Sequence, residues 1–148
     1  MAQSQRLVEI ACIPEPFNGE RLREVRELFE KNAGLWARID TSGGTLTPEQ
    51  AIHGELLCRV YADGEAVALY VLHFYQAENR TEAFITFAHG RAELDLCAAV
   101  LPLIEAQCNG CGGLAMLTKR RGLKRKLARA GYVTVSESAG VAQMRKAL

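Results

Sequence analysis

The sequence predicts a single α/β domain, residues 1–148, with a mixed, mostly antiparallel central sheet of about seven strands and helices on both faces. Residues 55–88 hold three apolar runs separated by Asp63-Gly64 and by a polar turn at 78–80, the pattern of an antiparallel meander. Residues 81–118 then read as strand, helix and strand, a unit that brings two parallel strands together. The middle run of the meander, residues 65–76, is apolar on both faces, which predicts cover on each side.

Composition is that of an ordinary globular protein. Of the 148 residues, 49% are hydrophobic and 24% charged, and the net charge is +1. The five cysteines are an odd number and most lie in apolar runs, as reduced core thiols do, which indicates synthesis in a reducing compartment. We see neither a signal peptide nor an apolar run long enough to span a membrane, and expect a cytoplasmic protein.

The N-terminal part predicts one strand and two helices. Residues 6–13 are β-branched and apolar, and Pro14 and Pro16 should stop the strand. Asn18 caps an amphipathic helix that ends near Gly34. After a loop, Thr47-Pro48-Glu49-Gln50 is a capping box that starts a short helix ending at Gly54. We interpret the nearby His53 as a structural or solvated helix-end residue.

The C-terminal part predicts a helix over residues 95–108, a strand over 113–118, a short helix stopped by Gly131, and a closing hairpin of strands that begin at Tyr132 and Val141. Cys108 and Cys111 have C-x-x-C spacing without a second pair, so no metal site is predicted. We interpret them as incidental thiols in a helix-ending turn, with a redox pair as the alternative.

The turn over residues 88–93 is where this chain should hold a phosphate-bearing cofactor, if it binds one. Glycine-rich turns that enter a helix bind phosphate through unpaired N–H groups and the helix dipole. Here the turn has one glycine, Gly90, and the helix begins with Glu93 and Asp95, whose charges would repel a second anion.

The order of elements resembles the GNAT acetyltransferase superfamily over nearly the whole chain. The most specific match is GLAMLTKRRGLKRKLARAGYVTV, which resembles the strand, helix and Gly-aromatic segment near the C-terminus of that family, with Gly131 and Tyr132 in the Gly-aromatic positions. The resemblance implies a GNAT fold and an acetyl-CoA site. Its phosphate-binding positions fall on His89, Gly90 and Arg91.

The chain departs from the family at two points of that site. The spaced second glycine of the phosphate turn is missing, and the tyrosine that often serves as general acid is Leu127 here. Degenerate GNAT-like phage proteins, including internal virion proteins of podoviruses, are similar in these respects. We therefore expect acetyl-CoA to bind weakly or not at all, and favour a non-catalytic binding or assembly protein that enters a phage particle. The alternative is an acetyl-CoA-dependent N-acetyltransferase with an atypical phosphate loop.

Catalytic candidates are few. The family often takes its general base from the last strand of the meander, so Glu82 and the neighbouring His89 are the candidates if the chain is an enzyme, since both side chains can accept a proton near neutral pH.

A basic cluster is the clearest signal for a partner. Seven basic residues and no acidic one lie between 119 and 129: Lys119, Arg120, Arg121, Lys124, Arg125, Lys126 and Arg129. Spacing of three and four stacks like charges on one helix face, which costs roughly 0.2–0.5 kcal/mol per pair. We expect this helix to face solvent or to contact an anionic partner, either an acidic protein surface in a larger assembly or homo-oligomer, or a nucleic-acid backbone.

Overall fold

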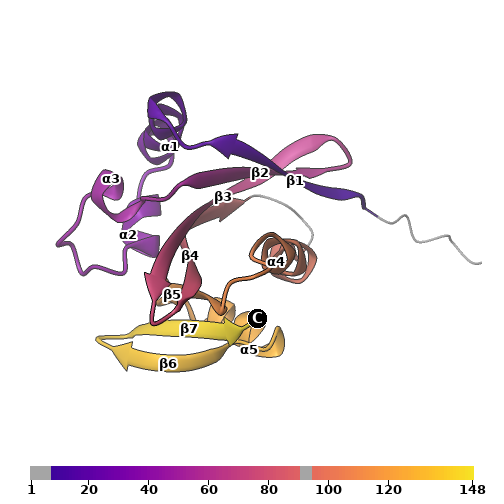
Figure 1. The fold of residues 1–148 in the computed structure, drawn as a ribbon. Coiled ribbons are helices and arrows are strands. Elements are labelled where there is room, and N and C mark those ends of the chain that lie inside the picture. The colour runs from indigo at the N-terminus through magenta and orange to yellow at the C-terminus, as the bar shows by residue number, and fades with distance from the viewer. Residues whose placement is uncertain (1–7, 91–94) are drawn as a thin grey trace, which may run out of the picture.

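The structure is a computed structural model that describes residues 8–90 and 95–148. Its elements follow one another as twelve short segments, drawn in Figure 1: β1 (Ile10–Pro16), α1 (Gly19–Lys31), α2 (Leu35–Ile39), α3 (Pro48–Ala51), β2 (Leu56–Ala62), β3 (Glu65–Ala77), β4 (Arg80–Gly90), α4 (Leu96–Gln107), β5 (Gly113–Thr118), α5 (Arg121–Arg129), β6 (Val133–Ser138) and β7 (Val141–Ala147). None of the helices in these ranges is long and apolar enough to cross a membrane.

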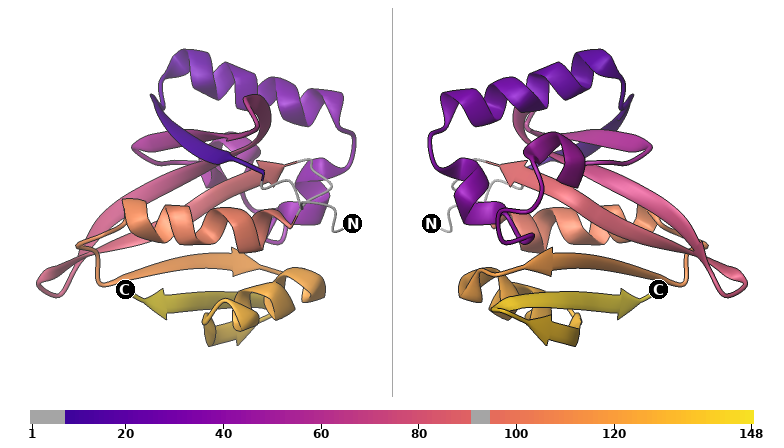
Figure 2. Two further views of the ribbon diagram at one scale, coloured as in Figure 1. Left: turned by 90° about the vertical axis from the view of Figure 1, so that its right-hand side faces the viewer. Right: turned by 90° about the vertical axis from the view of Figure 1, so that its left-hand side faces the viewer.

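All seven strands form one sheet in the order β1-β2-β3-β4-β5-β7-β6. The β4–β5 pair is parallel and every other neighbouring pair is antiparallel. Helices cover both faces: α1, α2 and α3 lie on one side, and α4 and α5 on the other (Figures 1 and 2). The predicted α/β class and mixed sheet are confirmed.

Two cores hold the helices to the sheet. On the α4 side, Leu101, Ile104 and Leu127 pack with Tyr70 and Leu72 of β3. On the α1 side, a smaller cluster contains Val25, Ile52 and Val71. Alternate residues of β3 thus serve opposite cores, because successive side chains of a strand point to opposite faces. The prediction that this strand is covered on both faces is confirmed.

The β4–β5 pair separates soon after it forms. Its ladder is only three residues long, from Ala83↔Leu114 to Ile85↔Met116, whereas β4 continues to Gly90. On its other edge β4 stays paired with β3, where Val71 pairs with Phe87 and Leu72 with Ile85, so that Thr86 is bulged. A bulge bends its strand and increases the local twist. The result is a gap in the sheet between residues 86–90 and the end of β5.

Several boundaries differ from those expected. β1 runs through Pro14 and Pro16 rather than stopping before them, because it is an edge strand, where a residue without an N–H is tolerated. β4 extends to Gly90, so His89 and Gly90 belong to a strand and not to a turn. The rest of the predicted phosphate turn, residues 91–93, lies outside the described residues. The five-residue α2 falls in a segment for which only a loop was expected.

Candidate functional site

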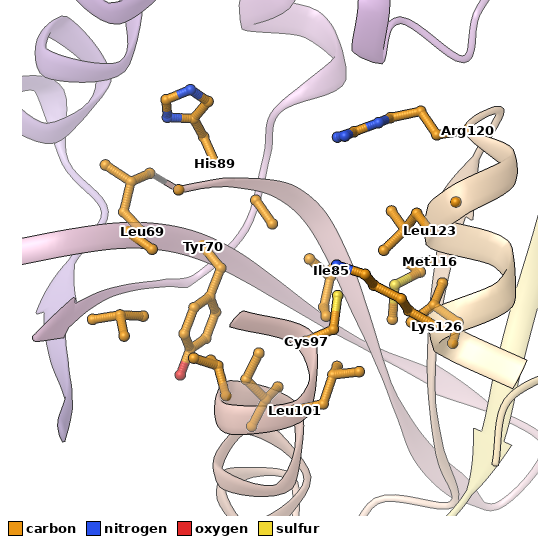
Figure 3. Close-up of a pocket in the computed structure, with 18 residues that line it drawn as sticks. Leu69, Tyr70, Ile85, His89, Cys97, Leu101, Met116, Arg120, Leu123 and Lys126 are labelled. Atoms are coloured by element: carbon orange, nitrogen blue, oxygen red, sulfur yellow. The ribbon is translucent and has the colours of Figure 1, made fainter. Parts of the chain in front are cut away.

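A pocket of about 540 Å³ opens at the gap, on the side of α4 and α5. We call it the α4-side pocket. Its wall is largely apolar: Ile85 of β4 and Met116 of β5 mark the point where the strands part, and Tyr70 and Leu101 lie at its base (Figure 3). The pocket exists because two neighbouring strands diverge and leave the space between them unfilled.

Two cations from α5 stand over this pocket. Arg120, the N-cap residue of α5, projects over the gap toward β4, and Lys126 extends toward Cys97 of α4 (Figure 3). The Lys126 ammonium also lies 3.6 Å from the Asp95 carboxylate, which caps α4 by accepting hydrogen bonds from the backbone N–H groups of Cys97 and Ala98. The N-terminus of α4 is thus already complemented by its own carboxylate, and positive charge over the pocket comes from side chains.

A second pocket of about 280 Å³ lies on the opposite face of the sheet, under α2 and α3. We call it the α2-side pocket. Its lining includes Trp36 of α2 together with Arg38, His53 and Lys119. Five residues line both pockets: Ile85, Ala88, Met116, Arg120 and Leu123. Since these residues border the gap, the two pockets adjoin there, one on each face of the sheet.

His89, a predicted catalytic and cofactor-binding residue, lies at the end of β4 beside the gap. Its imidazole points away from the α4-side pocket (Figure 3). Burial, and then the nearby charge of Arg38, lower the pKa of His89 below its ordinary value. The ring is therefore neutral at pH 7 and able to accept a proton. Gly90 lines the α4-side pocket, and Arg91 lies outside the described residues.

His53, expected to be structural or solvated, is exposed, and its backbone is tied to the bulge of β4. Its backbone carbonyl accepts a hydrogen bond from Thr86 Oγ1 at 2.7 Å. His53 Nδ1 lies 3.2 Å from the carbonyl oxygen of Ala51. A carbonyl only accepts, so in the neutral ring Nδ1 holds the proton and Nε2 is the basic nitrogen. The imidazole ring of His73 packs edge-on against that of His53, with the two ring centroids 4.7 Å apart. Nδ1 of His73 lies 3.1 Å from Glu55 Oε1. No local sequence signal indicates these contacts.

Glu82, the other catalytic candidate, sits near the start of β4 and lines neither pocket. It is 6% exposed and accepts a hydrogen bond from Arg145 Nε at 2.9 Å, with Arg145 Nη2 at 2.8 Å. Its second oxygen is 3.8 Å from Arg80 Nε. The structure thus separates Glu82 from His89 and gives Glu82 the partners of a structural carboxylate.

Neither tyrosine near the α4-side pocket offers a free hydroxyl. Tyr70 donates to Gln107 Oε1, and Tyr132 donates to Glu105 Oε2 at 3.0 Å. Burial raises the pKa of both phenols well above the ordinary value. Leu127, which occupies the position of the family's general acid, is 1% exposed and lines the pocket. No described tyrosine is placed to protonate a group leaving from this pocket.

The predicted basic cluster divides among different places. Arg120 lines both pockets, Lys126 the α4-side pocket and Lys119 the α2-side pocket, where the Lys119 ammonium donates to the Ala37 carbonyl at 2.7 Å. Lys124 pairs with Glu137 at 2.9 Å. Three exposed arginines of α5 make no ion pair with any described residue: Arg121, Arg125 and Arg129. Arg129 also lines a small pocket between α5 and α4, beside Lys126.

No family model and no curated protein sequence matches this chain. Solved structures do match. The GNAT domain of S. lividans PAT superposes with a TM-score of 0.62 at 15% identity, over 91% of this chain and 89% of that one. An N-acetyltransferase from Staphylococcus aureus Mu50 superposes with a TM-score of 0.61 at 10% identity, over 96% of this chain and 98% of that one. An Arabidopsis thaliana protein in complex with the bisubstrate analogue CoA-Ac-MVNAL gives 0.58 at 9% identity, over 93% and 99%.

These neighbours superpose on nearly the full length of the chain. At such low identity the likeness concerns architecture, and the predicted GNAT-like sheet is confirmed by it. The chain has the fold of the GNAT acetyltransferases.

Proposed function

We propose that the chain binds an acyl-coenzyme A in the α4-side pocket and transfers its acyl group to an amine that enters from the α2-side pocket. One observation is the main support: two pockets on opposite faces of the sheet adjoin at the β4–β5 gap through five common residues. A protein that bound a single ligand would need one pocket. Two pockets that meet suit a reaction in which two substrates approach one carbon atom from opposite sides.

The residues around the gap suit an extended thioester. From Thr86 to Gly90 the edge of β4 facing β5 has no ladder partner within residues 8–90 and 95–148, so its outward backbone N–H and C=O groups suit pairing with an extended amide-containing chain, as a strand would pair. The apolar wall fits the hydrocarbon part of such a chain. Arg120 and Lys126 provide charge for phosphate groups, which the capped N-terminus of α4 does not. The weak binding expected from the sequence rests on the missing glycine and the acidic residues Glu93 and Asp95, whereas this proposal rests on the edge of β4 and the two cations.

The reaction needs little from the protein beyond positioning. Nitrogen attacks the thioester carbonyl carbon, a C–N bond forms, the C–S bond breaks, and the amine proton is lost while the thiolate leaves. Free N–H groups beside the Thr86 bulge suit the negative charge that develops on the carbonyl oxygen. His53 and His89 are the described bases nearest the gap. With Leu127 in place of an acid, we expect slow turnover, since acid catalysis commonly contributes about 100-fold or more.

A second candidate is the docking function favoured by the sequence, a binding or assembly protein of a larger particle such as a phage. The observation that supports it is that Arg121, Arg125 and Arg129 of α5 are exposed and form no ion pair within the described part of the chain. This candidate needs no ligand in either pocket.

Calorimetry with acetyl-CoA tests the proposal. We expect a dissociation constant in the micromolar range. Lys126→Glu should weaken binding about tenfold, because it replaces a charge-assisted contact by repulsion. Lys31→Glu, an exposed change in the last turn of α1, is the matched control and should leave affinity unchanged. Absence of binding at millimolar acetyl-CoA would refute acyl-CoA binding and favour the docking function.

A further inference from the structure

The α2-side pocket has a marked excess of positive charge. Arg38, Lys119 and Arg120 line it, and no carboxylate lies among its described lining residues. The three cations come from two separate elements, α2 and the segment that follows β5, and converge on one space. Like charges brought together in this way repel one another unless an anion joins them.

Two carboxylates next in sequence to lining residues, or one position removed from them, are engaged elsewhere. Asp40 is buried and accepts hydrogen bonds from Ser42 N and Oγ and from Gly44 N at 2.6–2.9 Å, which lowers its pKa; the charge of Lys119 acts in the same direction but more weakly. Glu55 accepts from the backbone N–H of Phe74 at 3.0 Å and lies beside His73. Lys119 is thus partly neutralised by Asp40, while Arg38 and Arg120 form no ion pair with any described residue.

The remaining wall is aromatic and aliphatic. Trp36, Phe84 and Phe87 line the pocket, and Phe29 packs edge-on behind the Trp36 ring with centroids 5.7 Å apart. Such a wall favours an apolar body on the ligand. A polyamine or another multiply charged cation would meet repulsion from the arginines and no carboxylate to pair with.

The positive charge of Arg38 and the base His53 act at different positions along β4. His53 is anchored to Thr86, directly after the last paired residue of the β4–β5 ladder. Arg38 acts on His89, three residues further along, which corresponds to about 10 Å of strand. A ligand with its amine near His53 and the start of the gap can therefore extend along β4 toward His89, where the charge of Arg38 is felt; Arg38 and His53 both line the pocket.

We infer that the acceptor of this pocket is an amine whose far end carries a carboxylate and whose body is apolar, in the size range of a short peptide. The amine approaches the gap beside His53, the apolar side chain lies against Trp36, and the carboxylate pairs with Arg38, with Lys119 adding positive charge to the same pocket. This inference rests on the proposed function for the role of the ligand as an acyl acceptor, but the binding of the ligand is a separate property of the free protein.

Trp36 provides a direct readout, because it is the single tryptophan of the chain and lines this pocket. Its fluorescence would be titrated, without any cofactor, with phenylalanylglycine and with phenylalanylglycinamide. The two dipeptides share the same amine and apolar side chain, and only the first has a carboxylate. We expect the carboxylate form to bind at least about fivefold more tightly at low salt, and the difference to shrink at high salt.

Arg38→Gln should remove most of that difference, since Arg38 lines this pocket and not the other. Arg23→Gln, an exposed change on α1, should preserve it. Equal affinities, tighter binding of the amide, or no fluorescence change with either dipeptide at tens of millimolar would overturn the inference. Acetyl-CoA calorimetry on the same protein distinguishes failure of this inference from failure of the proposed function. Acetyl-CoA binding without selectivity for the carboxylate refutes this inference alone, whereas absence of acetyl-CoA binding refutes the proposed function.

Discussion

Replacing Glu82 by glutamine separates a structural carboxylate from a catalytic base. In the folded protein the Glu82 carboxylate is 8% exposed in its side chain and receives Nε and Nη2 of Arg145 at 2.9 and 2.8 Å. Glutamine keeps the shape but loses the charge, so the Arg145 guanidinium would remain over Gly113 without its counter-ion. A Cβ at Gly113 would lie 2.4 Å from Arg145 Nη2, which shows how closely the guanidinium packs there.

The cost follows from burial. Removing one partner of a fully buried ion pair costs about 3–5 kcal/mol. Arg145 is 24% exposed and keeps part of its hydration, so we expect a lower value, about 2–3 kcal/mol. For a domain of this size that corresponds to a decrease of about 5–10 °C in melting temperature. Glu30→Gln, an exposed change on α1, is the control and should shift stability by less than about 0.5 kcal/mol.

Urea unfolding of four proteins measures this: wild type, Glu82→Gln, Arg145→Gln and the double variant. Because the two side chains touch, the double variant should lose less than the sum of the single losses, with a coupling of about 1–3 kcal/mol. A Glu82→Gln protein as stable as wild type that has lost acyl transfer would refute the structural assignment and restore Glu82 as the base.

Three further predictions concern protons, thiols and charge. The pKa of His89 in the folded protein lies below its ordinary value of 6.5, so the unfolded chain binds the proton first as the pH falls. Folding stability should therefore decline below about pH 6.5. In melting curves measured against pH, His89→Asn should flatten that decline. Cys108 is fully buried, so Cys108→Ser should lower the free energy of unfolding by about 1–2 kcal/mol, whereas Cys111→Ser should change it little. Burial also raises the pKa of Cys108 to about 12, so a thiol reagent should react at Cys108 only in the unfolded protein. Replacing the exposed arginines Arg121, Arg125 and Arg129 of α5 by glutamate should leave the circular dichroism spectrum unchanged. The same change should weaken association with an anionic partner at low salt. Unchanged association would show that these arginines are merely solvated.

Local chemistry made much of the fold predictable. Asn18 accepts a hydrogen bond from Arg21 N, and the capping box at Thr47 and Gln50 forms in both directions. Asp63 has positive φ in the hairpin turn that its sequence indicates. Each of these signals depends on residues within four positions of one another, and so it can be recognised from sequence alone.

The sequence is least informative where distant parts of the chain decide the structure. Pro14 and Pro16 continue β1 because that strand lies at the sheet edge, and edge position is set by the order of all seven strands. Glu82 has its partner 63 positions away in Arg145. His53 became part of the candidate site through a hydrogen bond from Thr86, 33 positions away. Such pairings depend on topology, which local periodicity does not contain.

The substitution at Leu127 bears on rate more than on binding. A tyrosine there would act only when the thiolate leaves, so its absence removes stabilisation of the transition state and leaves ground-state contacts in place. Leu127 is instead buried with Tyr70 and Ile104, where it contributes apolar surface to the core under the α4-side pocket. If the proposed function holds, affinity for the thioester should depend on the edge of β4 and the cations of α5, and turnover on the missing acid. The two quantities should therefore diverge in this protein, with binding near that of an ordinary enzyme and transfer about 100-fold slower.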